Sequence, residues 1–401
     1  MSGSESYDVV VIGGGIHGAG AAQAAAACGA RVLLLEQERY AGATSGRSSK
    51  LIHGGLRYLE TGQLGLVRES LRERETLLKI APALVKRAAF YIPVYAHTRR
   101  RPWRIRAGLT LYALLGGLGP AVRFRRLPRP EWAGLDGLKT AGLQAVFCYQ
   151  DAQTDDVLLT RAVLDSARRL GAELECPARF VSARRMDEGY SLRYRKSGRE
   201  IECRARTLVN AAGPWVHAVL DGIAPAPPRL AVDLVQGAHC VVEGEIHRGV
   251  YYVEAPRDGR AVFVMPWRGR ILIGTTETAF SGDPAAVAPL AGEIDYLLET
   301  FRHHFPEQRG RLVESFAGLR VLPRGAGAHF HRPRETVLHP DDARRPRLVT
   351  IYGGKLTGYR ATAERVLRLL APQLRIDRQW ADTAEIPLVP PPENDALNMT
   401  P

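Results

Sequence analysis

The stretch YDVVVIGGGIHGAGAAQAAAACGARVLLLE, residues 7–36, decides the fold class. Residues 7–12 form a short apolar, β-branched run, which predicts a buried parallel strand. The turn GGGIHG follows, then an alanine-rich segment that predicts a helix ending near Gly29, and then a second apolar run. Because the glycine motif stands between a predicted strand and a predicted helix, and Glu36 closes the next strand, it predicts a dinucleotide-binding βαβ unit. The alternative is a glycine-rich turn in an unrelated α/β domain.

The spacing of the glycines suits the chemistry of a dinucleotide. Gly13 permits the tight turn, Gly15 lets the backbone approach a pyrophosphate, and Gly18 allows the helix to pack closely. The free N–H groups at the start of the helix favour phosphate groups. Glu36 can accept hydrogen bonds from the adenosine ribose. The position of this unit at the N-terminus favours FAD over NAD as the cofactor.

Two later segments repeat the pattern of a strand followed by glycine. They are RTLVNAAGPW, residues 206–215, and RLVTIYGGKLTGYRATAERVLRLL, residues 347–370. In the second, we expect a helix to begin at Lys355 and to direct its N-terminus at an electron-accepting ring. The alternatives are a packed crossover for the first segment and a glycine-rich connection for the second.

Residues 229–280 differ from the rest, because β-rich runs alternate there with charged turns and no long helix intervenes. This predicts an α/β fold in which a Rossmann-like FAD-binding domain is interrupted by a mainly antiparallel β-sheet substrate domain. We expect the FAD-binding domain to comprise residues 1–90, 150–228 and 336–385. The substrate or cap domain would then comprise residues 91–149 and 229–335, with a flexible Pro-rich tail at 386–401.

The amino-acid composition limits the classes of binding partner and the cellular setting that we expect. The 401 residues carry a net charge of +13, which favours an acidic partner such as nucleic acid, anionic lipid or a phosphorylated substrate. The five cysteines are scattered, so they predict neither a disulfide framework nor a metal site. The polar first residues predict no signal peptide, and a reducing cytoplasmic setting fits best.

The chain resembles the FAD-dependent glycerol-3-phosphate dehydrogenases, within the D-amino-acid-oxidase-like flavoprotein superfamily. The resemblance extends from about Tyr7 to Arg360, and SSKLIHGGLRYLE and GGKLTGYR are its most specific blocks. The other matching blocks are YDVVVIGGGIHGAG, LVNAAGPWV, QGAHCVV, FVMPW, IGTTET, FAGLRVLP and PRETVLH. It implies FAD-linked oxidation of sn-glycerol 3-phosphate to dihydroxyacetone phosphate, with a hydride passing from C2 to flavin N5 and electrons passing to membrane quinone.

The resemblance also implies roles for particular residues. The substrate phosphate would be bound by Arg57 with Tyr58 and by Arg334, because the guanidinium fork suits phosphate oxygens. Arg320 would hold the C2 oxygen, and His53 and His239 are alternative proton acceptors. Lys355 would contact the substrate or the flavin. The alternatives are a solvated surface charge for an arginine and a structural hydrogen bond for a histidine.

The expected FAD-binding residues come from all three glycine-containing segments and from the loop that follows the second strand. They are Gly13, Gly15, Ile16, His17, Gly18, Glu36, Gln37, Thr44, Ser45, Ser48, Ser49, Lys50, Leu51, Val181, Ala212, Gly213, Trp215, Gly353, Gly354, Lys355, Leu356 and Thr357. Arg47 stands where the family pattern has a small residue, so it either touches the pyrophosphate or adenylate or points to solvent.

Residues 98–130 combine an apolar centre with dense arginines, Trp103 and Tyr112. This pattern favours a segment lying on an anionic membrane surface; the alternatives are a buried connecting helix and, less favoured, nucleic-acid binding. We therefore expect a cytoplasmic enzyme peripheral to the inner face of the membrane, linked to quinone, with no nucleic-acid partner and with a possible homodimer. The alternative functions are an oxygen-using glycerol-3-phosphate oxidase, a relative acting on another small hydroxy acid or amine, and a flavin-bearing binding protein without catalysis.

Overall fold

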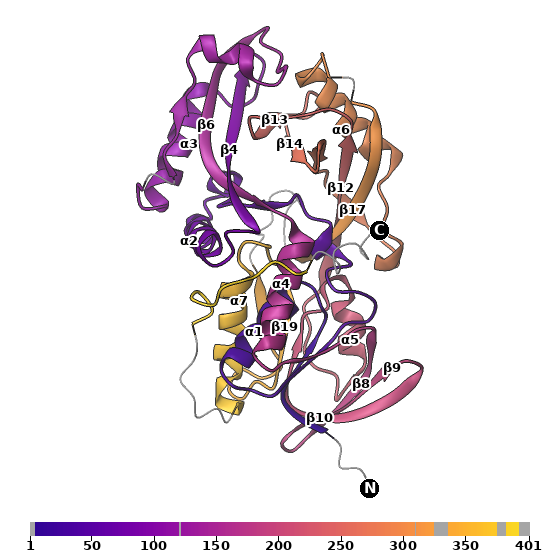
Figure 1. The fold of residues 1–401 in the computed structure, drawn as a ribbon. Helices are drawn as coiled ribbons and strands as arrows, with labels where there is room; N and C mark the ends of the chain where they lie inside the picture. The colour runs from indigo at the N-terminus through magenta and orange to yellow at the C-terminus, as the bar shows by residue number, and fades with distance from the viewer. Residues whose placement is uncertain (1–4, 120–121, 309, 325–335, 375–381, 393–401) are drawn as a thin grey trace.

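Two sheets organise the chain, and each lies at the centre of one lobe (Figure 1). The computed structural model describes residues 5–119, 122–308, 310–324, 336–374 and 382–392. One lobe holds α1, α7, β10 and β19, and the other holds β4, β6, β12 and β17. The predicted fold class is confirmed, because a mixed α/β unit is interrupted by a largely antiparallel sheet. The exact domain boundaries stay a prediction.

The first sheet joins strands from three separate parts of the chain. Its strands β1, β2, β7, β10 and β19 pair in parallel, while β8 and β9 continue it as an antiparallel ribbon that pairs with β10. Its nine strands are β1 (Glu5–Ile12), β2 (Val32–Leu35), β7 (Glu173–Glu175), β8 (Ala178–Met186), β9 (Gly189–Lys196), β10 (Arg199–Asn210), β11 (Ile223–Ala224), β18 (Val337–Pro340) and β19 (Leu348–Tyr352).

The second sheet is antiparallel except where β13 pairs in parallel with β4. The long strands β12 and β17 pair along nearly their whole length. Its ten strands are β3 (Leu51–Ile52), β4 (Val85–Tyr95), β5 (Arg125–Arg126), β6 (Leu143–Thr154), β12 (Val232–Val242), β13 (Val250–Glu254), β14 (Ala261–Trp267), β15 (Arg270–Gly274), β16 (Thr278–Phe280) and β17 (Leu312–Pro323).

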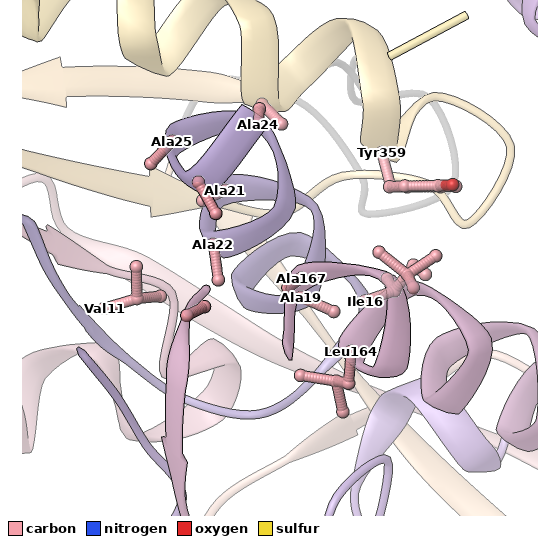
Figure 2. Close-up of a cluster of buried hydrophobic side chains, with 14 of the residues drawn as sticks. Val11, Ile16, Ala19, Ala21, Ala22, Ala24, Ala25, Leu164, Ala167 and Tyr359 are labelled. Atoms are coloured by element: carbon pink, nitrogen blue, oxygen red, sulfur yellow. The ribbon is translucent and has the colours of Figure 1, made fainter. Parts of the chain in front are cut away.

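Helix α1 is buried around almost its whole circumference, which explains its alanine-rich sequence. Small side chains let it approach β1 on one side and the helices α4 and α7 on the others, and Figure 2 shows Leu164, Ala167 and Tyr359 around it. A helix that is apolar all round is stable only when enclosed in this way. The α-helices are α1 (Ile16–Ala27), α2 (Leu64–Ile80), α3 (Pro102–Leu115), α4 (Asp156–Arg169), α5 (Val216–Asp221), α6 (Ala291–His304) and α7 (Tyr359–Leu370).

The expected helix start at Lys355 is wrong. Strand β19 ends at Tyr352 as predicted, but α7 begins only at Tyr359. Gly353 and Gly354 both have left-handed backbone angles, with φ of 71° and 108°, so residues 353–358 form a loop instead of a first helical turn. No helix N-terminus lies at Lys355, and the N–H groups near it belong to this loop.

Two further segments acquire defined positions. In the expected flexible tail, Leu388 is buried and its N–H donates to the carbonyl of Ile80 at 2.7 Å, so this part of the segment packs at the end of α2. In the basic segment, α3 buries Ile105, Leu109 and Tyr112 against the second sheet. None of the described helices combines the length and the apolar character that crossing a bilayer requires.

Candidate active site

A cavity of about 480 Å³ lies where the two sheets meet. Its wall is built from the turn after β1, the end of β2, the loop 42–58, the turn after β10, the strands β12 and β17, and the loop after β19. These segments are far apart in the sequence, and all three glycine-containing segments contribute to the wall. The cavity therefore gathers the predicted cofactor and substrate residues in one place.

One end of the cavity has the geometry of a nucleotide site. Gly13 has φ of 112°, and a Cβ on it would lie 2.6 Å from the carbonyl oxygen of Ala211, so only glycine fits this turn. The N–H of Gly14 donates to Glu36 at 2.7 Å, and the N–H of Ile16 donates to the Ser45 hydroxyl at 2.9 Å. Burial raises the pKa of Glu36, although backbone N–H groups oppose the shift. The turn, the acidic residue and the helix start are thus held together at one edge of the sheet.

Most of the predicted FAD-binding residues line the cavity. They are Gly13, Gly15, Ile16, His17, Glu36, Gln37, Thr44, Ser45, Ser48, Ser49, Leu51, Ala212, Gly213, Trp215, Gly353, Gly354, Lys355, Leu356 and Thr357.

Gly18, Lys50 and Val181 are not among the lining residues. Gly18 packs the helix on the turn, since a Cβ there would lie 1.9 Å from the Gly13 carbonyl oxygen. Lys50 is buried and forms an ion pair with Asp156 at 2.6 Å, so its ammonium group is engaged away from the cavity. Beside Val181, it is the neighbouring residues 179 and 180 that line the wall.

Arg320, the expected ligand of the C2 oxygen, projects from β17 into the cavity. Its Nη2 donates to the Thr275 hydroxyl at 3.3 Å, and its Nη1 lies 3.4 Å from Glu277 Oε1. Gly237 leaves room for the guanidinium, because a Cβ there would lie 2.9 Å from Arg320 Nη2. Burial, and then the charge of Arg57, lower the pKa of Arg320 to about 10. The cation is thus held by Thr275 and Glu277, while a quarter of its side chain stays exposed.

The two expected proton acceptors have different surroundings. His239 is buried in β12, its Nε2 lies 2.8 Å from the Ser49 hydroxyl, and its ring stacks on Phe316. Burial and the charges of Lys50 and Arg320 lower its pKa well below the ordinary value. His53 is half-buried at the cavity wall, and its backbone N–H donates to the Thr357 hydroxyl at 3.2 Å. The low pKa of His239 therefore favours its neutral form.

The expected substrate residues lie on one short 3₁₀ helix and the loop opposite it. Arg57 and Tyr58 belong to η2 (Leu56–Thr61), which begins after the left-handed Gly55. The Lys355 ammonium lies 3.6 Å from the centre of the Tyr58 ring, a cation–π contact. All three line the cavity. Arg334 lies outside the described residues, so its predicted role stays a prediction.

Several lining residues were absent from the sequence-based set. Arg39 and Arg179 line the wall. Arg47, whose two alternative positions were left open above, also lines it and donates to the carbonyl of Ala317 at 3.3 Å. Arg47 thus turns toward the cavity instead of pointing freely into solvent. Other lining residues that were missed include Tyr149, Tyr252, Phe263 and Thr275. Thr275 lies in the quoted block IGTTET, whose hydroxyls were a usable signal; the aromatic residues gave none, because their strands read as ordinary core.

The residues present fit FAD. A Cβ on Gly15 would lie 2.9 Å from the Ser45 hydroxyl, so the backbone is bare where a pyrophosphate would approach. Within the described part of the chain, the Nδ1 atoms of His17 and His239 are buried without a hydrogen-bond partner, and both residues line the cavity. Such polar atoms suit the oxygen and nitrogen edges of a bound flavin. No three His, Cys, Asp or Glu side chains in the described ranges cluster in a way that could hold a metal ion.

Known proteins resemble this chain in sequence and in fold. The family model described as FAD dependent oxidoreductase matches residues 8–381. The chain is 40% identical over 393 residues to a glycerol-3-phosphate dehydrogenase of Pseudomonas aeruginosa, covering 96% of this chain and 75% of that protein. It is 38% identical over 399 residues to a D-erythritol 1-phosphate dehydrogenase of Brucella abortus, covering 96% of this chain and 78% of that protein.

A solved structure shows the same architecture. The glycerol-3-phosphate dehydrogenase of Bacillus halodurans, solved with FAD, superposes with a TM-score of 0.74 at 26% identity, covering 97% of this chain and 68% of that one. The chain therefore belongs to the FAD-dependent oxidoreductase family, in the branch that contains the glycerol-3-phosphate dehydrogenases. It is a flavin oxidoreductase whose cofactor is FAD.

Proposed function

We propose that this protein oxidises the secondary hydroxyl of sn-glycerol 3-phosphate to give dihydroxyacetone phosphate. The observation that carries the proposal is the convergence of Arg57, Arg320 and Lys355 with His53 on the wall of one FAD-binding cavity. A small dianion with an oxidisable secondary hydroxyl suits this set, because the cations can hold the phosphate and the oxygen while the imidazole accepts a proton. The similarity to relatives named glycerol-3-phosphate dehydrogenase supports the same substrate.

Each side chain then has a defined task. Arg57 binds phosphate oxygens with its guanidinium fork, and Lys355 adds a second positive charge from the opposite loop. Arg320 stabilises negative charge as it develops on the C2 oxygen. FAD, when bound, supplies the acceptor for the hydride that leaves C2. The hydroxyl proton passes to a side chain of the protein.

We assign that proton to His53 in preference to His239. The pKa of His239 is held far below the ordinary value, and its Nε2 is engaged by Ser49, so it is a weak base. His53 lies on the same wall, close in sequence to Arg57, and the turn that carries both is held by the Thr357 hydroxyl. The proton acceptor and the phosphate ligand are thus positioned by a single loop.

Turnover with an artificial electron acceptor tests the substrate. We expect dihydroxyacetone phosphate from sn-glycerol 3-phosphate, much slower turnover of unphosphorylated glycerol, and no turnover of glycine, sarcosine or lactate. D-Erythritol 1-phosphate belongs in the same experiment, because one relative is named for it. Faster turnover of any non-phosphorylated compound would contradict the proposal.

We further propose that the electrons pass to a membrane quinone. The support comes from the exposed side of α3 and the turn after it, where Trp103, Leu114 and Leu118 are 66%, 54% and 62% exposed. We call these three residues the α3 face. Exposed Arg104 stacks on the Trp103 ring, and exposed Arg123 follows the helix in the sequence, so apolar and positively charged groups occur together, a combination that suits an anionic lipid surface. A ubiquinone analogue should therefore reoxidise the reduced protein much faster than dioxygen does; hydrogen peroxide formed at the rate of turnover would instead favour an oxidase.

A further inference from the structure

Glu277 connects two arginines of the cavity. Its Oε1 lies 3.5 Å from Nη2 of Arg57 and 3.4 Å from Nη1 of Arg320. It stands in the short loop between β15 and β16, and its side chain is only 8% exposed. Glu277 is not one of the residues that line the cavity. It therefore lies behind the two guanidinium groups instead of facing the space that a substrate would occupy.

The two arginines need such a partner, because they come from different elements and carry the same charge. Arg57 is on η2 and Arg320 is on β17. Positive charges in a buried site repel each other, and the influence of Arg57 on the pKa of Arg320 is second only to burial. One carboxylate oxygen shared by both nitrogens offsets this repulsion. It also fixes the two groups within the span of a single small molecule.

The loop that carries Glu277 holds Arg320 at a second point. Thr275 accepts a hydrogen bond from Nη2, while Glu277 faces Nη1, so the fork is oriented by two residues of the same loop. Neighbouring Thr276 and Thr278 anchor the loop itself, since both donate to buried Glu293, at 2.6 and 2.7 Å. The position of the carboxylate is thus determined by the sheet.

We propose that Glu277 is a positioning residue that sets the separation of Arg57 and Arg320, and that this separation selects substrates with one carbon between the oxidised carbinol carbon and the phosphate ester oxygen. The inference rests on the proposed function, in which Arg57 holds the phosphate and Arg320 holds the C2 oxygen. Glu277 acts through the arginines and takes no part in the chemistry.

The test compares two substrates that differ by one carbon, sn-glycerol 3-phosphate and 3,4-dihydroxybutyl phosphate, in anaerobic stopped-flow reduction of the FAD-loaded protein. For Glu277→Gln we expect the apparent Kd for glycerol 3-phosphate to rise about tenfold or more, since the two guanidinium groups lose the shared carboxylate that fixes their separation. The preference of the wild type for the shorter substrate should fall by a similar factor. Glu277→Asp keeps the charge on a shorter side chain. It should therefore retain part of the affinity for glycerol 3-phosphate and part of the preference for the shorter substrate.

Asp341→Asn is the matched control, because Asp341 is also a carboxylate with a nearly buried side chain paired with an arginine, Arg185, but it lies between β18 and β19 of the first sheet and does not line the cavity. It should lower the Tm and leave the discrimination between the two substrates intact. FAD content and Tm are measured for every variant. If Glu277→Gln does not fold, the Kd and the substrate preference of Glu277→Asp test the proposal.

The two possible failures differ. If neither phosphate reduces the wild-type flavin, the proposed function and this inference both fail. If the wild type is reduced but both Glu277 variants keep its Kd and its substrate preference, only this inference is wrong.

Discussion

Arg320 projects a partly exposed positive charge into the cavity and is held in place by Thr275 and Glu277, which is the arrangement expected of a group that stabilises a developing oxyanion. We predict that Arg320→Ala slows flavin reduction by glycerol 3-phosphate about 10²- to 10³-fold, the usual effect of removing one such donor. FAD should remain bound, because the nucleotide end of the cavity is built from other segments. Stopped-flow spectra and the flavin-to-protein ratio measure the two effects. Loss of FAD together with the rate would show a structural role instead.

Variants of His53 and His239 show which of the two histidines accepts the substrate proton. We predict that His53→Gln slows flavin reduction about 10²-fold or more, because glutamine cannot accept a proton at neutral pH. His239→Gln should have a much smaller effect on the rate, since burial lowers the pKa of His239 well below its ordinary value, which makes it a weak base, and its Nε2 is bonded to Ser49. The same anaerobic experiment on both variants decides, and a slower His239→Gln variant would reverse the assignment.

Lys50 provides a test of stability. Its ion pair with Asp156 is almost completely buried, at 5% and 0% side-chain exposure. Lys50→Met leaves a buried carboxylate without its cation, so we predict a loss of about 3–5 kcal/mol in the free energy of unfolding. The double variant Lys50→Met with Asp156→Leu should regain most of it. Urea unfolding of the FAD-saturated proteins measures both, and equal losses in both variants would contradict the account.

At this scale the sequence identified residues that stand in short motifs and missed those that depend on distant partners. The roles of Gly13 and Glu36 could be predicted, because both roles depend only on residues within the same βαβ unit. Lys50 stands in an equally specific motif, yet its ammonium group forms an ion pair with Asp156, which is far away in the sequence. Glu277 could not be recognised, since only the folded sheet brings it between Arg57 and Arg320.

Among the elements, α3 connects the surface to the site. The Tyr112 hydroxyl accepts from the Gly54 N–H at 2.9 Å and donates to Asp151 at 2.7 Å, and Asp151 is in turn paired with buried Arg74 at 2.6 Å. Gly54 precedes the turn that carries Arg57. The inner side of α3 therefore supports the loop of the active site, while its outer side carries the α3 face.

We predict that Tyr112→Phe lowers the free energy of unfolding by about 1–3 kcal/mol, the usual result of leaving a buried polar group unsatisfied. It should also slow flavin reduction, because the loop with His53 and Arg57 loses a support. Tyr95→Phe is the control: the Tyr95 hydroxyl bonds to the carbonyl of Lys139 in a different part of the sheet. A rate equally lowered in both variants would show that the effect is general destabilisation.

The elements were predicted well where one pattern dominates. The strand–turn–helix unit at the N-terminus and the β-rich run 229–280 both follow from periodicity. The predicted start of α7 was wrong, because Gly353 and Gly354 take left-handed backbone angles and the strand is followed by a loop. Sequence alone also could not show that one side of α3 is buried against the second sheet while apolar residues on its other side are exposed.

Over the whole molecule, the α3 face predicts binding to anionic membranes. Vesicles containing phosphatidylglycerol should carry the wild type in a flotation assay, and neutral phosphatidylcholine vesicles should carry much less. The double variant Trp103→Ser and Leu114→Ser should float less, whereas Met186→Ser, at an equally exposed position on β8, should not change. Equal flotation of all three proteins would remove α3 from the interaction.

The meeting of two sheets around one cavity is the central feature of this account, because one sheet supplies the nucleotide site and the other supplies Arg320. Anaerobic mixing of the FAD-loaded protein with sn-glycerol 3-phosphate tests it most directly. We predict that the absorption band of oxidised flavin bleaches in a single substrate-dependent phase and that dihydroxyacetone phosphate forms in equal amount to the flavin reduced. A flavin that stays oxidised at millimolar glycerol 3-phosphate would contradict the account.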